Sequence, residues 1–312
     1  MADDERTVPE DLGGSRLDKA VQALFGLDSR AQTRKLIEDG RVRKNGRRAP
    51  KGALVDAGDV LRIEGEAVSD AGSACVASPE APLDVVFESD LVVIVDKPAG
   101  MSTAPLRAGE TGTLANALLG RHPELAGVGY SAREPGLLHR LDRGTSGLVI
   151  AARTGDAFVE LTRALKEGAI AKRYLVVCTE EGLPDEGSIE IGLANHPKDQ
   201  RRVLACLHPR DVMRLAPRAA TTRYRVDRRA NGLALVSVWA PKALRHQIRA
   251  HFAAIDHPLL GDDLYGGPPL PAACARVGHA LHACQVTHEH SDPQLSFDVT
   301  SPLPADLAAL VA

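Results

Sequence analysis

One aspartate lies between two arginines in the stretch Gly136–Ala152, which reads GLLHRLDRGTSGLVIAA. Arg140 and Arg143 flank Asp142, and a run of Gly, Thr, Ser and Gly follows before the aliphatic residues resume. A carboxylate in this setting can be a nucleophile or a base, or it can be the ion-pair partner of an arginine in a polar turn. These residues alone leave the three roles open.

A second polar cluster spans Leu244–Gly267 and holds Arg245, His246, Gln247, Arg249, His251, His257, Asp262, Asp263 and Tyr265. Arg249 begins a helical face, where its guanidinium can hold a carboxylate by two hydrogen bonds. His246 and His251 lack the i, i+4 spacing of a helical metal pair, and no HExxH sequence is present. We therefore predict no metal site here, and none at His282, His288 and His290.

A third element, AKRYLVV, has the composition of a strand. Its period of two places Lys172 and Tyr174 on one face and Arg173 on the other. The pattern alone does not decide whether the Tyr174 ring packs in the core or has a role in the site. In VDKPAGMS, Lys97-Pro98 with Gly100 indicates a fixed turn that can present a lysine.

Composition limits the class of protein. The chain has 312 residues, 44% of them hydrophobic, which suffices for one large domain and a smaller one. The acidic start, MADDERTVPE, does not resemble a secretory signal, and no apolar run reaches the roughly 18 residues of a membrane span. The five scattered cysteines form no CxxC pair, so we expect a reduced, cytoplasmic chain without disulfides.

The net charge of −3 conceals strong segregation. Residues 29–51 carry nine Lys or Arg against two acidic residues, and residues 198–229 carry ten against three. Residues 64–90 carry seven acidic residues and no basic one. Such runs can be solvated faces, but two in one chain favour contact with the phosphates of a nucleic acid.

The chain divides by pattern into four parts. Residues 1–14 read as a flexible tail, 15–64 as a compact unit, 65–82 as a linker rich in small residues, and 83–312 as the main domain. In the compact unit, Leu17 to Leu24 have helical spacing, Ser29 and Gly40 bound a second helix, and Asn45-Gly46 indicates a hairpin turn. In the main domain, short strand-like runs alternate irregularly with helical patterns near 114–119, 158–165 and 247–254, which favours a mixed α+β domain.

Taken together, HRLDRGTSGLVI, KRY, HQIRAH, HPLLGD and DKPAGM resemble the motifs of the RluA-type RNA pseudouridine synthases. RLDKAV, SRAQTRKLIEDGRV and NG resemble the alpha-L RNA-binding domain that often precedes them. The resemblance covers roughly residues 15–305. It implies an α+β fold, in which a mixed-sheet pseudouridine synthase catalytic domain follows a small α/β RNA-binding domain.

The resemblance also implies a function, the isomerisation of specific uridines in structured RNA to pseudouridine. Asp142 matches the catalytic aspartate, Arg249 the arginine that pairs with it, and Tyr174 the tyrosine that packs on the target base. Arg140 matches the arginine that fills the space left by the flipped nucleotide. We assign substrate binding to Arg140, Lys172 and His139, and RNA binding to Arg30, Arg34, Lys35, Arg41, Arg43 and Lys44. We expect no metal or cofactor, a monomer, and ribosomal RNA of the large subunit as a partner before transfer RNA.

The sequence departs from the family pattern at three places. Gly144 stands where an acidic residue is usual, Ala243-Leu244-Arg245 replace Gly-Arg-Thr, and Ala104-Pro105 replace a histidine and proline. Two other readings stay open. A nucleoside or glycoside hydrolase would need a second carboxylate, for which Asp262 or Asp263 is available. A non-catalytic RNA-binding or assembly protein would need the basic N-terminal unit but neither Asp142 nor Tyr174.

Overall fold

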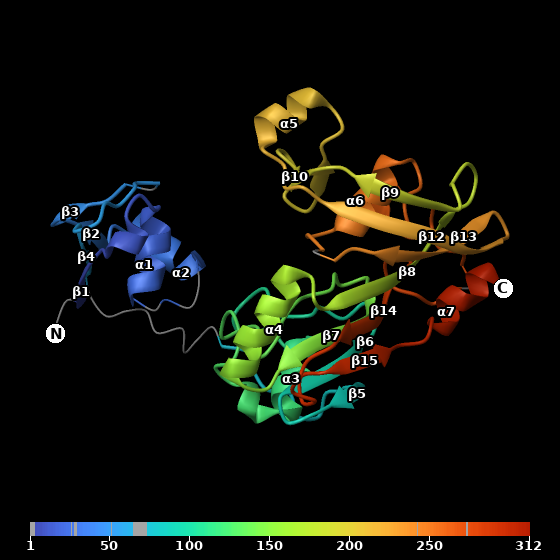
Figure 1. The fold of residues 1–312 in the computed structure, drawn as a ribbon, viewed down its shortest axis with the longest axis horizontal. Coiled ribbons are helices and arrows are strands. Elements are labelled where there is room, and N and C mark those ends of the chain that lie inside the picture. The colour runs from blue at the N-terminus through green and yellow to red at the C-terminus, as the bar shows by residue number, and fades with distance from the viewer. Residues whose placement is uncertain are drawn as a thin grey trace. The chain divides into compact units, whose positions relative to one another are not determined.

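The computed structural model describes residues 4–25, 27, 30–50, 52–64, 74–241, 243–272 and 274–312 (Figure 1). The chain forms two compact units. One comprises residues 1–75 with the short segments 107–109 and 130–133, and the other comprises the remaining residues. Within the described ranges, no helix is long and apolar enough to cross a membrane.

The N-terminal unit is a four-stranded antiparallel sheet with two helices. The sheet order is β1-β4-β2-β3, from Asp4–Thr7, Val60–Ile63, Val42–Lys44 and Arg47–Arg48, and the helices are α1 (Leu17–Phe25) and α2 (Arg30–Glu38). Asn45 and Gly46 both have positive φ, 50° and 74°, as the predicted hairpin turn requires. Ser29, the predicted cap of the second helix, lies outside the described residues. The apolar faces of both helices and the inner faces of the strands share one core.

The prediction of a flexible tail over residues 1–14 is wrong for the described residues 4–14. Strand β1 pairs with β4 from Asp4 to Thr7, and Val8, 2% exposed, belongs to the core. A strand at a sheet edge is held by backbone hydrogen bonds, so the polar sequence DERT carried no apolar signal of it.

The predicted linker 65–82 also ends earlier than expected. Residues 65–73 lie outside the described part of the chain. Beyond them, Ser78 N donates to Asn116 O (2.9 Å), and the Asn116 side-chain amide donates to Val76 O (2.7 Å). Residues 76–78 are therefore attached to helix α3 (Leu114–Arg121) of the second unit.

The second unit is built on one large mixed sheet. Eight of its strands follow the order β5-β6-β7-β14-β8-β13-β12-β9, and β15 also pairs with β14. Only β7 and β14 run parallel, and the other described pairs are antiparallel. The strands are β5 (Val85–Glu88), β6 (Val92–Lys97), β7 (Ser146–Ala152), β8 (Ala171–Thr179), β9 (Glu186–Glu190), β12 (Thr221–Ala230), β13 (Leu233–Trp239), β14 (Leu281–His288) and β15 (Phe297–Thr300).

Helices cover this sheet at different places (Figure 1). Helix α4 (Gly155–Glu167) packs Ala157, Leu161 and Ala164 against the aliphatic residues of β6 and β7. Helix α6 (Gln247–Ala254) lies near β12, where the Phe252 and Tyr224 rings are 5.6 Å apart. The C-terminal helix α7 (Ala305–Ala308) joins a smaller apolar cluster with Val177. Between β9 and β12, a hairpin of β10 (Leu193–Asn195) and β11 (Val203–Ala205) and helix α5 (Pro209–Leu215) extend beyond the sheet edge.

Candidate active site

The turn that carries Asp142 directly precedes β7. Thr145 N donates to Asp142 O (3.0 Å), which closes the turn. Thr103 holds the turn from the side, because its hydroxyl donates to Leu141 O (2.7 Å) and accepts from Leu141 N (3.1 Å). Gly100 N donates to Arg143 O (2.7 Å), and Arg143 Nε donates back to Gly100 O (2.8 Å). The backbone on both sides of Asp142 is therefore fixed by the loop 97–103.

Lys97 organises that loop instead of presenting its amine to a ligand. Its side chain is 0% exposed, and Nζ donates to Pro98 O (2.9 Å) and Met101 O (2.8 Å). Burial lowers the pKa of Lys97 to about 8. Gly100, at φ 88°, allows the tight turn that brings these carbonyls to the amine.

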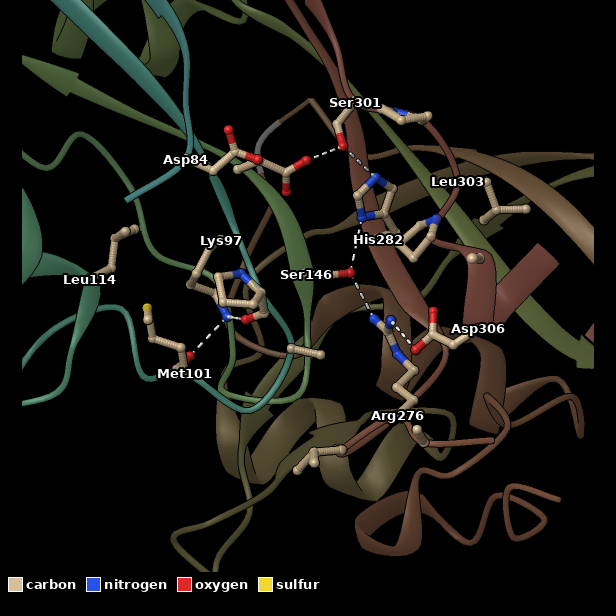
Figure 2. Close-up of a pocket in the computed structure, with 18 of the residues that line it drawn as sticks. Asp84, Lys97, Met101, Leu114, Ser146, Arg276, His282, Ser301, Leu303 and Asp306 are labelled. Carbon is tan, nitrogen blue, oxygen red and sulfur yellow. Dashed lines mark hydrogen bonds and ion pairs between the residues drawn. The ribbon is translucent and has the colours of Figure 1, made fainter. Parts of the chain in front are cut away.

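A cavity of about 620 Å³ borders the same loop, and Figure 2 shows the polar chain that crosses it. The Ser301 hydroxyl donates a hydrogen bond to the Asp96 carboxylate and lies 3.0 Å from His282 Nε2. His282 Nδ1 in turn lies 2.9 Å from Ser146 Oγ. Arg276 Nη2 then donates to Ser146 Oγ (2.8 Å). These hydrogen bonds connect Ser146, the first residue of β7, to β6, to β14 and to the segment before β14. Ser146 directly follows the Asp142 turn, so the network also anchors that turn.

Arg249 joins two carboxylates from different parts of the chain. Its Nη1 donates to Asp142 Oδ2 (2.7 Å), and its Nε and Nη2 donate to the two oxygens of Asp262 (2.7 Å each). The Arg249 side chain is 8% exposed and the Asp262 side chain 1%. The predicted contact between Arg249 and Asp142 is confirmed across 107 positions of sequence.

Charge at this centre favours the ionised aspartate. Burial disfavours the carboxylate of Asp142, but attraction to His246 and Arg249 outweighs it and lowers the pKa below its usual value. For Arg249, burial is likewise opposed by the hydrogen bonds and charges of Asp262 and Asp142, which raise its pKa. An always-charged arginine thus holds Asp142 ionised at neutral pH.

A cavity of about 1160 Å³ opens above this pair. It is lined by all six side chains assigned from sequence to catalysis and substrate binding: His139, Arg140, Asp142, Lys172, Tyr174 and Arg249. Strand β8 directs Lys172 and Tyr174 to the same side, as its period predicts. The side chains assigned from the family motifs and the strand period therefore line one cavity.

Their environments differ. Tyr174 is 5% exposed, its hydroxyl has no hydrogen bond within the described part of the chain, and burial raises its pKa. Burial lowers the pKa of Lys172 to about 8, and burial with Lys172 nearby lowers that of His139 to about 3. His139 Nε2 accepts from Ile150 N (3.2 Å), so it supports β7. Arg140 is exposed and pairs with Glu134 (2.8 Å).

Several residues of the site were not predicted from the sequence. Asp262 was considered only as a second catalytic carboxylate, yet both its oxygens accept from Arg249 and it is buried, which removes it as the partner that a hydrolase would need. His246 Nε2 lies 3.6 Å from Asp142 Oδ1, and its Nδ1 lies 3.0 Å from the Tyr265 hydroxyl. The motif HPLLGD contained Asp262, but no local pattern indicated what it binds.

The N-terminal unit has fewer free charges than its sequence suggests. Arg34 pairs with Glu38 (2.9 Å), Arg43 with Glu64 (2.9 Å) and Lys44 with Asp59 (2.7 Å), and Arg41 Nε donates to Glu64 O (2.8 Å). The side chains of Arg30 and Lys35, also assigned to RNA binding, lie outside the described residues. Arg47 on β3 is exposed and was missed as an individual candidate.

The described ranges contain no group of three or more His, Cys, Asp or Glu side chains that could hold a metal ion.

Comparisons with known proteins agree with this arrangement. Residues 91–254 match the RNA pseudouridylate synthase family, and residues 15–61 match the S4 domain. The ribosomal large subunit pseudouridine synthase D of Nitrosomonas europaea is 34% identical, over 98% of this chain and 86% of that protein. The protein of the same name from Yersinia pestis is 31% identical, over 98% and 92%. Human RNA pseudouridylate synthase domain containing 1 shares the fold, with a TM-score of 0.55 and 21% identity over 72% of this chain and 85% of that one.

The family match spans the Asp142 turn, strand β8 and helix α6, and the relatives align over nearly the whole chain. The mixed α+β fold and the two-part organisation predicted from the sequence agree with these matches. This chain therefore belongs to the RNA pseudouridine synthase family and carries an S4 domain before its catalytic domain.

Proposed function

We propose that this enzyme isomerises uridines in large-subunit ribosomal RNA, with Asp142 as the catalytic carboxylate. The observation that carries the proposal is the ion pair of Asp142 with Arg249 (2.7 Å) at the base of a cavity that also holds Tyr174. We choose large-subunit ribosomal RNA because relatives that align over nearly the whole chain are ribosomal large subunit pseudouridine synthases. The S4 domain at residues 15–61 and the basic segment 198–229 supply positive charge for an RNA partner.

The reaction exchanges one bond to the ribose for another. The bond between uracil N1 and ribose C1′ breaks, and its electron pair stays with the uracil. The ring then turns, C5 bonds to C1′, the proton on C5 leaves, and N1 takes up a proton, so that the product is an isomer of the substrate. An ionised Asp142 can attack C1′ or support the positive charge that develops there, and Arg249 orients it.

Access to Asp142 requires the uridine to leave its helix. A cavity of about 1160 Å³ has room for a flipped nucleotide, and enzymes that act on bases use such a pocket. Tyr174 would stack on the uracil from the wall of the cavity. Arg140, exposed beside it, would fill the space left in the RNA.

We expect Tyr174→Phe to reduce isomerisation much more than RNA binding, and Tyr174→Ala to reduce both. Phe keeps the ring, whose stacking on a base contributes about 1–3 kcal/mol. The hydroxyl has a raised pKa and is therefore protonated at neutral pH, so it can take the C5 proton only by passing its own onward. Single-turnover rates and RNA dissociation constants measure the two effects. If Tyr174→Phe is fully active, the hydroxyl takes no part in proton transfer and the ring serves only to stack on the base.

Removing residues 1–64 should weaken RNA binding and flatten its salt dependence, while some activity remains. The basic run of residues 29–51 lies in this segment, and each lost phosphate contact lowers the slope of log affinity against log salt by about 0.7–0.9. Affinity measured at several salt concentrations gives the slope. An unchanged slope would mean that the basic run is an ordinary solvated surface.

Two single substitutions make a matched control for that result. Arg47 is exposed and has no ion pair within the described part of the chain, whereas Arg34 is paired with Glu38 on the same helix. Arg47→Ala should therefore lower the slope more than Arg34→Ala. If the two variants show the same salt dependence of RNA affinity, the exposed Arg47 contributes no more to phosphate binding than the paired Arg34, and the prediction is wrong.

The function itself is tested by incubating the purified enzyme with large-subunit ribosomal RNA and measuring pseudouridine and free uracil. The proposal predicts pseudouridine without accumulating uracil. Free uracil would indicate a hydrolase, and binding without either product would indicate an assembly protein. Loss of product in Asp142→Ala would tie the reaction to this cavity.

A further inference from the structure

His279 is a buried residue of the Asp142 cavity that the proposed mechanism has not used. It lies two residues before β14 and is 4% exposed. Its Nε2 lies 2.8 Å from the hydroxyl of Thr145, the residue that closes the Asp142 turn. Its Nδ1 has no hydrogen-bond partner among the side chains and backbone that the structure describes. His279 is thus a largely buried side chain in a cavity wall, with one ring nitrogen left to bind a ligand.

Glycine at position 144 keeps this nitrogen accessible. A Cβ atom added to Gly144 would lie 2.9 Å from Nδ1 of His279. A Cβ on Gly278 would lie 2.5 Å from the Cα of Gly144, so two glycines allow the two segments to approach. The acidic side chain that the family resemblance leads one to expect at 144 would occupy this space. The departure at Gly144 and the open Nδ1 are thus one structural feature.

Arg276 holds the backbone of His279 in place. Arg276 Nε donates to His279 O (3.0 Å), and Arg276 Nη2 donates to Leu281 O (2.9 Å) and to Ser146 Oγ (2.8 Å). Arg276 itself pairs with Asp306 (3.4 Å), as Figure 2 shows. Arg276 therefore joins the backbone of His279 to the start of β7, and the contact with Thr145 places the imidazole beside the Asp142 turn.

The protonation of the ring suits a neutral hydrogen-bond donor. Burial, with Arg249 nearby, lowers the pKa of His279 to about 4, so at neutral pH the ring holds one proton. When the Thr145 hydroxyl donates to Nε2, that proton is on Nδ1, which then donates into the cavity.

We propose that Nδ1 of His279 donates a hydrogen bond to a ring carbonyl oxygen of the target uracil. This inference rests on the proposed function. When the bond between N1 and C1′ breaks, its electron pair spreads from N1 over the ring to O2 and O4. A fixed donor at either oxygen stabilises that charge in the transition state. His279 is on this account a catalytic residue, because it contacts the reacting base.

Two substitutions separate contact from packing. Asparagine places a side-chain N–H close to the position of the imidazole Nδ1, whereas leucine fills similar space without a donor. We expect His279→Leu to lower the single-turnover rate by about 10–100-fold with RNA affinity unchanged, in line with the loss of one oriented donor. His279→Asn should recover most of that rate. Thermal unfolding of both variants checks their folding.

The decisive comparison uses RNA in which the target uridine carries sulfur in place of O2 or O4, because sulfur is the weaker acceptor. In the wild-type enzyme, one of the two thio-substituted RNAs should react several-fold more slowly than the other, beyond any difference inherent to the bases. In His279→Leu that selective loss should disappear, and in His279→Asn it should persist. If the Leu variant does not fold, Gly144→Ala replaces it, because the added Cβ would lie 2.9 Å from Nδ1.

A slow Leu variant that keeps the wild-type response to both thio-substituted RNAs would overturn the inference, since His279 would then act only through Thr145 on the Asp142 turn. A Leu variant with wild-type rate would overturn it as well. Wild-type enzyme that makes no pseudouridine from the unmodified RNA would instead refute the proposed function, and that control is run first.

Discussion

Replacing Asp142 by asparagine is expected to lower the isomerisation rate by at least about 1,000-fold, the scale at which removing a reacting group acts. Asparagine nearly preserves the shape of the side chain but removes the negative charge that the ribose carbon requires. Arg249 keeps its two hydrogen bonds to Asp262, so the fold around the site should survive. The rate is measured in single turnover with purified variant, beside its RNA affinity and its unfolding temperature.

Asp263 offers a matched control for that experiment. It is an exposed carboxylate of the same cavity, so Asp263→Asn changes the charge of the site without touching the ion pair with Arg249. We expect the Asp263 variant to stay within a few-fold of wild type. Normal turnover in Asp142→Asn would rule out Asp142 as the catalytic group.

Arg249→Ala is expected to remove activity and to destabilise the protein by about 3–5 kcal/mol, because it leaves the buried carboxylate of Asp262 without a partner. Arg249→Lys should also be impaired, although it keeps the charge. The guanidinium makes three hydrogen bonds to two carboxylates in one plane, and an ammonium group cannot reproduce that geometry. Chemical denaturation and single-turnover rates measure the two effects separately.

The double variant Arg249→Ala with Asp262→Asn tests the reason for the loss. Removing the buried charge of Asp262 should recover much of the stability but none of the activity, since Asp142 still lacks its partner. Full stability in Arg249→Ala alone would mean that the buried ion pair contributes little. Wild-type turnover in Arg249→Lys would show that the planar contact is not required.

Local patterns in the sequence predicted much of the site. The period of β8 placed Lys172 and Tyr174 on one face, and a helix over Gln247–Ala254 was expected where α6 lies. The contact between Arg249 and Asp142 was expected from family motifs, not from spacing. Strands β6 and β7 are almost continuously apolar, as buried strands are, which is why such segments stand out in the sequence as strand-like runs.

Long-range partners could not be predicted in the same way. Strand β14 lies in the middle of the sheet, but its sequence LHACQVTH mixes polar and apolar residues. The polar His282 is tolerated in the interior because its ring hydrogen-bonds to Ser146 and Ser301. Strand β12 carries arginines along its exposed face and was also missed. That Thr103 holds Leu141, and that Asp262 holds Arg249, depends on segments that only the folded chain brings together.

The structure also accounts for two departures from the family pattern. Gly144 accommodates Gly278 and His279. In the segment Ala243-Leu244-Arg245, Leu244 N donates to the Gln247 side chain (2.9 Å), and Arg245 Nη2 donates to Gln200 O (2.6 Å). The start of α6, which carries Arg249, is therefore anchored by contacts of this chain's own residues.

We propose that this chain makes pseudouridine in large-subunit ribosomal RNA through Asp142. The most direct measurement is a map of pseudouridines in that RNA from cells lacking the gene, complemented with wild type or with Asp142→Asn at equal protein levels. We expect specific pseudouridines to disappear without the gene, to return with wild type and to stay absent with Asp142→Asn. Unchanged pseudouridines in cells lacking the gene, or their full return with Asp142→Asn, would contradict it.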